Sequence, residues 1–207
     1  MKLTLSIVMA ALTLIACQEK PTNNQPKDGN IDDSIIHLLM SHYEIDEKDS
    51  NWVITRDSVS VMAEYHDPEL MIDGELLLSE MMAYSFPLRA NEYLFGDLND
   101  DGQDEVVLNE VVLGATHGPM MLDIFVFEGN PGAYKKRTCV TAHELSQCNE
   151  GAFTPAKIEK GFLIGTASCF DDDDPMCCPS LAYDLSFKLD GEKFVLNEKK
   201  ERPKNHN

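Results

Sequence analysis

Apolar and polar residues alternate through most of the second half of the chain, which is the pattern of β-strands that bury one face. The alternation is strictest over residues 181–189, where Asp184, Ser186 and Lys188 form the polar face. Asp190 and Gly191 then predict a two-residue hairpin turn into a further strand over 193–196. Similar segments occupy residues 93–95, 106–113, 120–127, 133–141 and 161–170. About six or seven short strands with no helix between them predict an antiparallel meander or sandwich.

The part of the chain before residue 90 mixes helix and strand signals. Asp32, Asp33 and Ser34 precede apolar residues at helical spacing, which predicts a capped amphipathic helix. Residues 52–54 and 59–62 have the composition of short strands, and 76–84 suits either a helix or a strand. The expected fold class is therefore mainly β, α+β overall. It comprises an N-terminal helix-containing segment over 31–90 and an antiparallel β domain over 91–198.

The N-terminus has the features of an exported protein. An apolar run over residues 3–16 is shorter than the about 20 residues that a membrane-spanning helix needs. The run ends in the sequence LIAC at residues 14–17, which resembles a bacterial lipobox. The resemblance implies that residues 1–17 are a lipoprotein signal peptide and that Cys17 receives a lipid and becomes the mature N-terminus.

The residues after Cys17 bear on location. Gln18 is not the Asp that resembles an inner-membrane retention signal, so the outer membrane or the cell surface is favoured. Residues 18–30 are too polar to bury a core, which predicts a flexible tether, and a polar tail is expected over 199–207. The expected location is the bacterial cell envelope, with the membrane contacted through the lipid on Cys17.

Residues 97–105 place oxygen-bearing side chains at alternate positions around Gly102. Loops that wrap Ca²⁺ use side-chain oxygens at positions 1, 3 and 5, a Gly at 6, a backbone carbonyl at 7 and an acid near 9. An EF-hand would need a bidentate Glu at position 12, where this chain has Leu108. The spacing therefore predicts a structural Ca²⁺ site of another kind. Its expected ligands are Asp97, Asn99, Asp101, Gln103 through its carbonyl, and Glu105.

The stretch from Gly96 to Val106 resembles the calcium loops of FG-GAP, integrin-type propeller and dockerin repeats. Residues 174–179, with the sequence DPMCCP, resemble a segment of small bacterial lipoproteins that carry such a loop earlier in their chains and have no settled activity. This chain departs from the repeats in having Glu105 where Asp is usual. Propellers and dockerins repeat the loop, whereas it occurs once here. The resemblance therefore implies calcium ligation and neither of those architectures.

The charge balance restricts the partners. The chain has 36 acidic and 17 basic residues and a formal net charge of −19. This charge disfavours binding to nucleic acid and to an anionic bilayer surface, because both would repel the protein. Besides the membrane, the expected partner is an unidentified envelope or extracellular protein or glycan.

Five cysteines remain if Cys17 carries a lipid, and an oxidising compartment makes them disulfide candidates. We expect one disulfide between Cys139 and Cys148. We expect another from Cys169 to Cys177 or Cys178, which would clamp the acidic run over 171–174. That run is either a solvated loop or a second, weak cation site. The open alternatives are a vicinal disulfide between Cys177 and Cys178, and a zinc site formed by Cys139, His143, Cys148 and a later cysteine.

The sequence carries no established catalytic motif. It lacks a Gly-x-Ser-x-Gly elbow, a His-Glu-x-x-His pair, a P-loop and a dinucleotide fingerprint. His66, His117 and His143 lie in or beside predicted turns, where each could act as a general base. His117 is the best placed of them, because the glycines beside it permit close approach of a substrate.

We therefore expect a binding or structural component with a calcium-stabilised β module rather than an enzyme. One alternative is a hydrolase of envelope or extracellular polymers with structural Ca²⁺, which would need a pocket where a histidine and a carboxylate converge. A binding module would instead expose an apolar or aromatic patch. The third possibility is a thiol-redox accessory protein built on Cys177 and Cys178.

Overall fold

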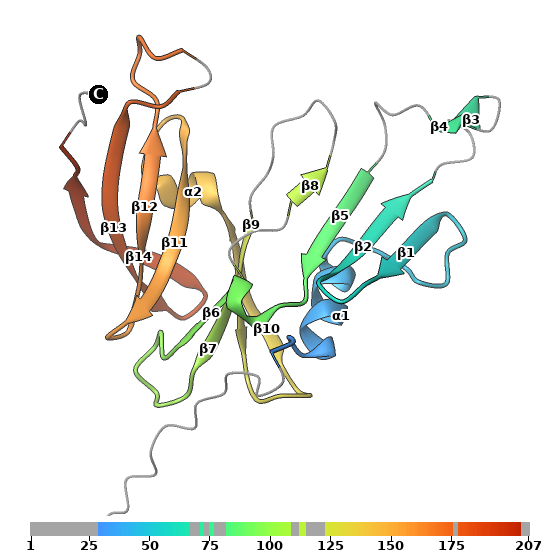
Figure 1. Cartoon of the computed structure of the whole chain (residues 1–207). Coiled ribbons are helices and arrows are strands. Elements are labelled where there is room, and N and C mark those ends of the chain that lie inside the picture. Colours follow the sequence, from blue (N-terminus) through green and yellow to red (C-terminus); the bar gives the residue numbers. More distant parts are fainter. Residues whose placement is uncertain are drawn as a thin grey trace, which may run out of the picture.

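The computed structural model describes residues 29–66, 71–72, 75–76, 82–108, 112–114, 123–175 and 178–203. Antiparallel strands dominate the fold, with a short helix near the N-terminus (Figure 1). The predicted fold class is therefore confirmed. The predicted signal peptide with Cys17, almost all of the tether, His117 and Cys177 lie outside the described residues.

The N-terminal layer combines a helix with a four-stranded sheet. Helix α1 (Asp33–His42) begins where Oδ1 of Asp32 accepts a hydrogen bond from the N–H of Ser34 at 2.8 Å, which confirms the predicted cap. Its buried residues, Ile35 and Leu39 among them, share a core with the strands. The sheet order is β1-β2-β5-β8, with β1 (Trp52–Arg56), β2 (Ser60–Tyr65), β5 (Met82–Pro87) and β8 (Val112–Gly114). A separate hairpin consists of β3 (Met71–Ile72) and β4 (Glu75–Leu76).

A second sheet lies in the middle of the fold and is buried on both faces. Its order is β10-β9-β7-β6, with β6 (Tyr93–Gly96), β7 (Glu105–Leu108), β9 (Asp123–Glu128) and β10 (Lys135–Thr141). Phe125 and Phe127 pack into the N-terminal core, whereas Ile124 and Val126 pack into a second core. Successive side chains of a strand point to opposite faces, so this double burial explains the continuous apolar run of β9.

The third sheet covers the other face of the middle sheet. It contains β11 (Gly151–Glu159), β12 (Phe162–Cys169), β13 (Leu181–Asp190) and β14 (Lys193–Glu201), in that order. Leu185, Phe187 and Leu189 of β13 lie in the second core, as their alternation predicts. The predicted turn joins β13 to β14, and Gly191 adopts a φ of +61°, which glycine reaches at no steric cost.

Four local features differ from the sequence-based expectations, and the first is that β14 continues to Glu201, into the polar tail predicted over 199–207. A short helix, α2 (Ala142–Ser146), lies between β10 and β11. Its start could have been predicted from the sequence, because Thr141 and Glu144 have the spacing of a capping box. Strand β11 is absent from the prediction, because a register shift after Pro155 interrupts its alternation. Residues 106–113 do not form one strand, since they divide between β7 of the middle sheet and β8 of the N-terminal sheet.

The middle and C-terminal sheets approach closely where β6 crosses β11. A Cβ atom placed on Gly96 would lie 2.7 Å from Cγ2 of Ile158. A glycine is therefore needed at the end of β6, immediately before the acidic loop. This close approach brings the loop against the C-terminal sheet.

Candidate cation site

The acidic loop over residues 97–104 connects β6 to β7 (Figure 1). Leu98 is fully buried in the core between the middle and C-terminal sheets, which anchors the start of the loop. Asp100 and Gly102 adopt φ angles of +61° and +85°. These left-handed residues reverse the chain, so the loop forms the tight turn that Gly102 predicts.

Backbone N–H groups of the loop converge on Asp97. Its Oδ1 lies 3.2 Å from the N–H of Asp101, and its Oδ2 accepts the N–H of Gly102 at 2.8 Å. Oδ1 of Asp101 in turn accepts the N–H of Gln103 at 2.8 Å. These bonds hold the carboxylates on the inside of the turn, where side-chain oxygens can meet a cation.

Glu105 is the buried acid of the site. It is 2% exposed, and its Oε2 accepts a hydrogen bond from the backbone N–H of Leu98 at 2.7 Å. Burial raises the pKa of the Glu105 carboxyl to about 7. The Leu98 hydrogen bond opposes this increase, and the negative charge of Asp101 adds to it. A buried carboxylate beside another acid is costly unless it is protonated or shares a cation.

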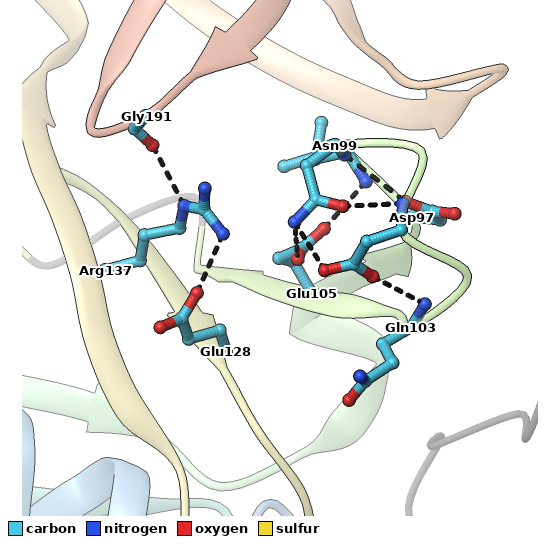
Figure 2. A network of polar contacts seen from close by, with 9 residues as sticks. Asp97, Asn99, Gln103, Glu105, Glu128, Arg137 and Gly191 are labelled. Atoms are coloured by element: carbon cyan, nitrogen blue, oxygen red, sulfur yellow. Dashed lines mark hydrogen bonds and ion pairs between the residues drawn. The ribbon is translucent and has the colours of Figure 1, made fainter.

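The amide of Asn99 bridges these two acids, and Figure 2 shows it beside Glu105. Its Nδ2 donates to Oδ2 of Asp101 and to Oε1 of Glu105, both at 2.9 Å. Its Oδ1 accepts the N–H of Asp101 at 2.8 Å. The partly positive NH₂ group therefore lies between two acidic oxygens. A half-turn of the amide would present Oδ1 to a cation held by the same carboxylates, and the N–H of Asp101 would then keep only its bond to Oδ1 of Asp97.

The loop brings most of the predicted ligand side chains together. Asp97, Asn99, Asp101 and Glu105 form one connected network, whereas the side chain of Gln103 points away from it (Figure 2). The predicted role of Gln103 uses its backbone carbonyl, so the direction of its side chain does not affect that role. This arrangement offers three carboxylates and one amide, an all-oxygen donor set that suits a hard cation.

The loop also contacts the C-terminal sheet. Oδ2 of Asp100 lies 3.4 Å from Nζ of Lys188 on β13. A Cβ atom on Gly161, in the turn between β11 and β12, would lie 2.6 Å from Oδ1 of Asp100. The loop therefore lies against the C-terminal sheet at Asp100, through an exposed ion pair.

A second polar link joins the same two sheets nearby. Arg137 of β10 donates from Nε to the carbonyl of Gly191 at 2.9 Å and from Nη1 to Oε2 of Glu128 at 2.7 Å (Figure 2). The hydroxyl of Thr138 donates to the carbonyl of Glu192 at 2.7 Å. The hairpin turn between β13 and β14 is thus fastened to β10 of the middle sheet.

The disulfide pairing differs from the predicted one. Cys148 is bonded to Cys169, and Cys139 is free. The predicted pair of Cys139 with Cys148 is therefore wrong, as is the predicted clamp from Cys169 to Cys177 or Cys178. The register pairs Cys169 of β12 with Gly151 of β11, which places Cys169 beside the segment that carries Cys148.

The other cysteine alternatives change accordingly. Cys178 is disulfide-bonded, while Cys177 lies outside the described residues. The zinc set of Cys139, His143 and Cys148 is excluded in that form, because the sulfur of Cys148 is used by its disulfide. Nδ1 of His143 instead lies 3.2 Å from the carbonyl oxygen of Gly151.

The acidic run over 171–174 forms a hydrogen-bonded turn. Oδ2 of Asp174 accepts the N–H groups of Asp171 and Ser180, both at 2.7 Å. Oδ1 of Asp171 accepts the N–H of Asp172 at 2.9 Å. Asp171, Asp172 and Asp173 are exposed. These carboxylates accept backbone hydrogen bonds of the turn and contact solvent, which favours the solvated loop over a second cation site.

A groove of about 400 Å³ lies against β12, β13 and β14. Its lining includes the half-buried Phe162 and Ile164, with Asp184 and Lys200 as charged groups. The residues that line it include no histidine, so this groove lacks the pair of histidine and carboxylate that a hydrolase would use. It remains open to a ligand that combines apolar and polar groups.

The described residues also expose a few large apolar side chains. Val53 and Met62 lie on the N-terminal sheet, and Val195 and Leu196 lie on β14. Single exposed apolar residues are ordinary at protein surfaces, and two separate pairs do not make a docking patch. The apolar patch expected of a binding module is therefore not found among the described side chains.

One cluster could not be predicted from spacing in the sequence. His42, Asp123 and Cys139 place their ligand atoms within 4.8 Å of one another. They belong to α1, β9 and β10, so only the packing of the helix on the middle sheet brings them together. His66 lies elsewhere, with its Nε2 3.8 Å from Oε2 of Glu64.

The described helices α1 and α2 are short, and no helix among the described residues is long and apolar enough to cross a membrane. The lipid anchor expected on Cys17 does not require such a helix, and Cys17 lies outside the described residues. No protein family, curated protein or solved structure matched the chain.

Proposed function

We propose that the protein is a lipid-anchored component of the bacterial cell envelope whose β module is stabilised by Ca²⁺ and serves in binding or structure. The observation that supports the calcium part most strongly is the burial of Glu105 beside Asn99 and Asp101 in a turn closed around Asp97. The lipobox-like sequence at residues 14–17 supports the anchoring.

The donor set favours Ca²⁺ over other cations. Asp97, Asp101 and Glu105 supply carboxylates, Asn99 supplies an amide and Gln103 a carbonyl, with no nitrogen or sulfur ligand. Hard cations prefer such oxygens. Mg²⁺ demands near-octahedral geometry and retains several waters, whereas Ca²⁺ accepts about 6–8 oxygens in a flexible loop.

The proposed role of the cation is to connect two sheets. A cation would remove the cost of burying the Glu105 charge and the repulsion between Glu105 and Asp101. It would also hold Asp100 against Lys188 and Gly161 of the C-terminal sheet. The groove against β12, β13 and β14 would then be held at a constant angle to the rest of the module, which suits a surface that binds a protein or a glycan.

The experiment is a thermal unfolding measurement in Ca²⁺ and in chelator. Loops of extracellular modules bind Ca²⁺ with dissociation constants of about 10⁻⁴–10⁻³ M, so about 1 mM Ca²⁺ should add roughly 0.4–1.4 kcal/mol to the free energy of unfolding. The thermal midpoint should rise by a few degrees. Mg²⁺ should raise it much less.

Two variants separate ligation from general charge effects. Asp101→Ala should abolish the difference between Ca²⁺ and chelator. Asp173→Ala removes the same charge from the exposed acidic turn and should leave the difference unchanged. Equal midpoints of the wild-type protein in Ca²⁺ and in chelator would overturn the calcium proposal and leave the loop as an acidic turn.

A further inference from the structure

The cluster of His42, Asp123 and Cys139 lies where the end of α1 meets the middle sheet. Cys139 pairs with Phe125 in the register of β10 and β9, and Asp123 pairs with Thr141. Asp123 and Cys139 are therefore diagonal neighbours on one face of the sheet. Phe125 and Cys139 border the N-terminal core, so α1 packs on this face of the sheet. The helix thereby places His42 beside Asp123 and Cys139.

The separation of the three groups is close to that of a tetrahedral metal site. Their ligand atoms lie within 4.8 Å of one another. A tetrahedral ion with bonds of about 2.0–2.3 Å separates its ligands by roughly 3.3–3.8 Å. Side-chain movements of about 1 Å would therefore suffice to close the site around an ion.

Neighbouring side chains already orient two of the groups. The ring of His42 makes edge contacts with Tyr43 and Phe125, with centroids 4.9 Å and 5.0 Å apart. The hydroxyl of Tyr43 donates to Oδ2 of Asp123 at 2.7 Å. Hydrogen bonds of this kind to a ligating carboxylate are typical supports of metal sites.

We propose that His42, Asp123 and Cys139 bind a divalent transition-metal ion of the Zn²⁺ class, at a site separate from the calcium loop. Imidazole nitrogen, carboxylate oxygen and thiolate sulfur together suit Zn²⁺ and disfavour Ca²⁺. Cys139 is the free cysteine among the described residues, while Cys148, Cys169 and Cys178 are disulfide-bonded. Three protein ligands leave a fourth position for water or a small ligand.

The protonation states of the free site set how binding depends on pH. Burial lowers the pKa of His42, the charge of Lys136 lowers it further, and the charge of Asp123 opposes both; the net decrease favours the neutral imidazole that metal binding requires. Burial raises the pKa of the Cys139 thiol to about 12, with the charges of Asp123 and Glu144 adding to the increase and that of Lys136 opposing it. An incoming ion must therefore displace the thiol proton, so metal affinity rises with pH.

Lys136 competes with the ion. Its Nζ lies 2.8 Å from Nδ1 of His42. An ion on Nε2 leaves a proton on Nδ1, which would repel the lysine ammonium, and an ion on Nδ1 would displace that ammonium directly. Lys136 is exposed and can move into solvent. Lys136→Met should therefore strengthen metal binding, an outcome that a purely structural role of the cluster does not predict.

The test is a titration of the full chain with Co²⁺, without reductant, followed by absorption spectroscopy. Thiolate bound to Co²⁺ gives a sulfur-to-metal charge-transfer band in the near ultraviolet, whereas the all-oxygen calcium loop gives none. Failure of this proposal and failure of the calcium proposal are therefore distinguishable. The wild-type protein should show the band, and Zn²⁺ should remove it by displacing Co²⁺.

Variants assign the band to the cluster. Cys139→Ser should abolish it. His42→Gln and Asp123→Asn should weaken Co²⁺ binding at least tenfold, because the loss of an outer-shell partner alone lowers metal affinity about 10–100-fold. His37→Gln, an exposed position on the same helix, is the matched control and should bind like the wild type.

Two outcomes would overturn the proposal. The first is a wild-type protein without a charge-transfer band, and the second is a band that persists in Cys139→Ser. If circular dichroism shows that Cys139→Ser does not fold, Lys136→Met and His42→Gln decide instead. Equal Co²⁺ affinity in these two variants and the wild type would then refute the site.

Discussion

Replacing Glu105 with Gln removes the one buried charge of the acidic loop while keeping the shape of the side chain. Glu105 is 2% exposed, and its two oxygens accept hydrogen bonds from the N–H of Leu98 and from Nδ2 of Asn99. Because burial favours the protonated acid, the folded protein holds a proton that the unfolded chain releases near its ordinary pKa. The perturbation therefore tests whether this single carboxyl makes stability depend on pH.

The shift in the pKa of Glu105 sets the direction and the size of the change in the free energy of unfolding. The pKa of Glu105 is about 7 in the folded protein, against an ordinary value of 4.5 for an exposed glutamate. Between these values the folded state binds more protons, so the free energy of unfolding falls as the pH rises. Linkage gives a loss of about 2.5 kcal/mol between pH 5 and pH 8 in the absence of Ca²⁺. Above about pH 7 the full cost of the buried charge is present.

The assay is denaturant unfolding at pH 5 and pH 8 in chelator. The wild-type protein should lose about 2.5 kcal/mol more than Glu105→Gln over this interval, because all other titrating groups are common to both. Glu198→Gln, at an exposed position of β14, should behave like the wild type. In millimolar Ca²⁺ the wild-type loss should shrink, since the ion stabilises the ionised carboxylate at pH 8. An identical loss in the wild type and in Glu105→Gln would refute the reasoning.

Three further predictions concern the rest of the chain. Replacing both Cys148 and Cys169 with Ser opens a loop with a sequence separation of 21, which should lower the free energy of unfolding by about 3 kcal/mol in denaturant titrations; an unchanged midpoint would contradict the bridge. Cys17→Ser should prevent lipidation, so the protein should leave the detergent phase, whereas unchanged partitioning and processing would count against the lipobox. Gly165→Ala places a Cβ 2.2 Å from the carbonyl oxygen of Thr154, so overpacking should lower the free energy of unfolding by about 1–3 kcal/mol in denaturant titrations. A variant as stable as the wild type would contradict this packing.

Local sequence determined the features that depend on neighbours along the chain. The cap of α1 at Asp32, the turn at Gly191 and the apolar face of β13 were readable because they depend on spacings of a few residues. The tight turn of the acidic loop was readable for the same reason, since Gly102 supplies the positive φ that the spacing requires. Helix α2 was also readable in principle, through its capping box.

Tertiary structure decided the features that depend on distant segments. The pairing of Cys148 with Cys169 follows from the register of β11 and β12. Strand β11 could not be predicted from alternation, because a bulge interrupts it. The burial of Glu105 depends on the two sheets that meet at its loop. The convergence of His42 with Asp123 and Cys139 depends on where α1 packs on the middle sheet. The sequence gives the chemistry of each side chain. The distances between groups far apart in the chain are set by the packing of whole sheets, which local spacing in the sequence does not determine.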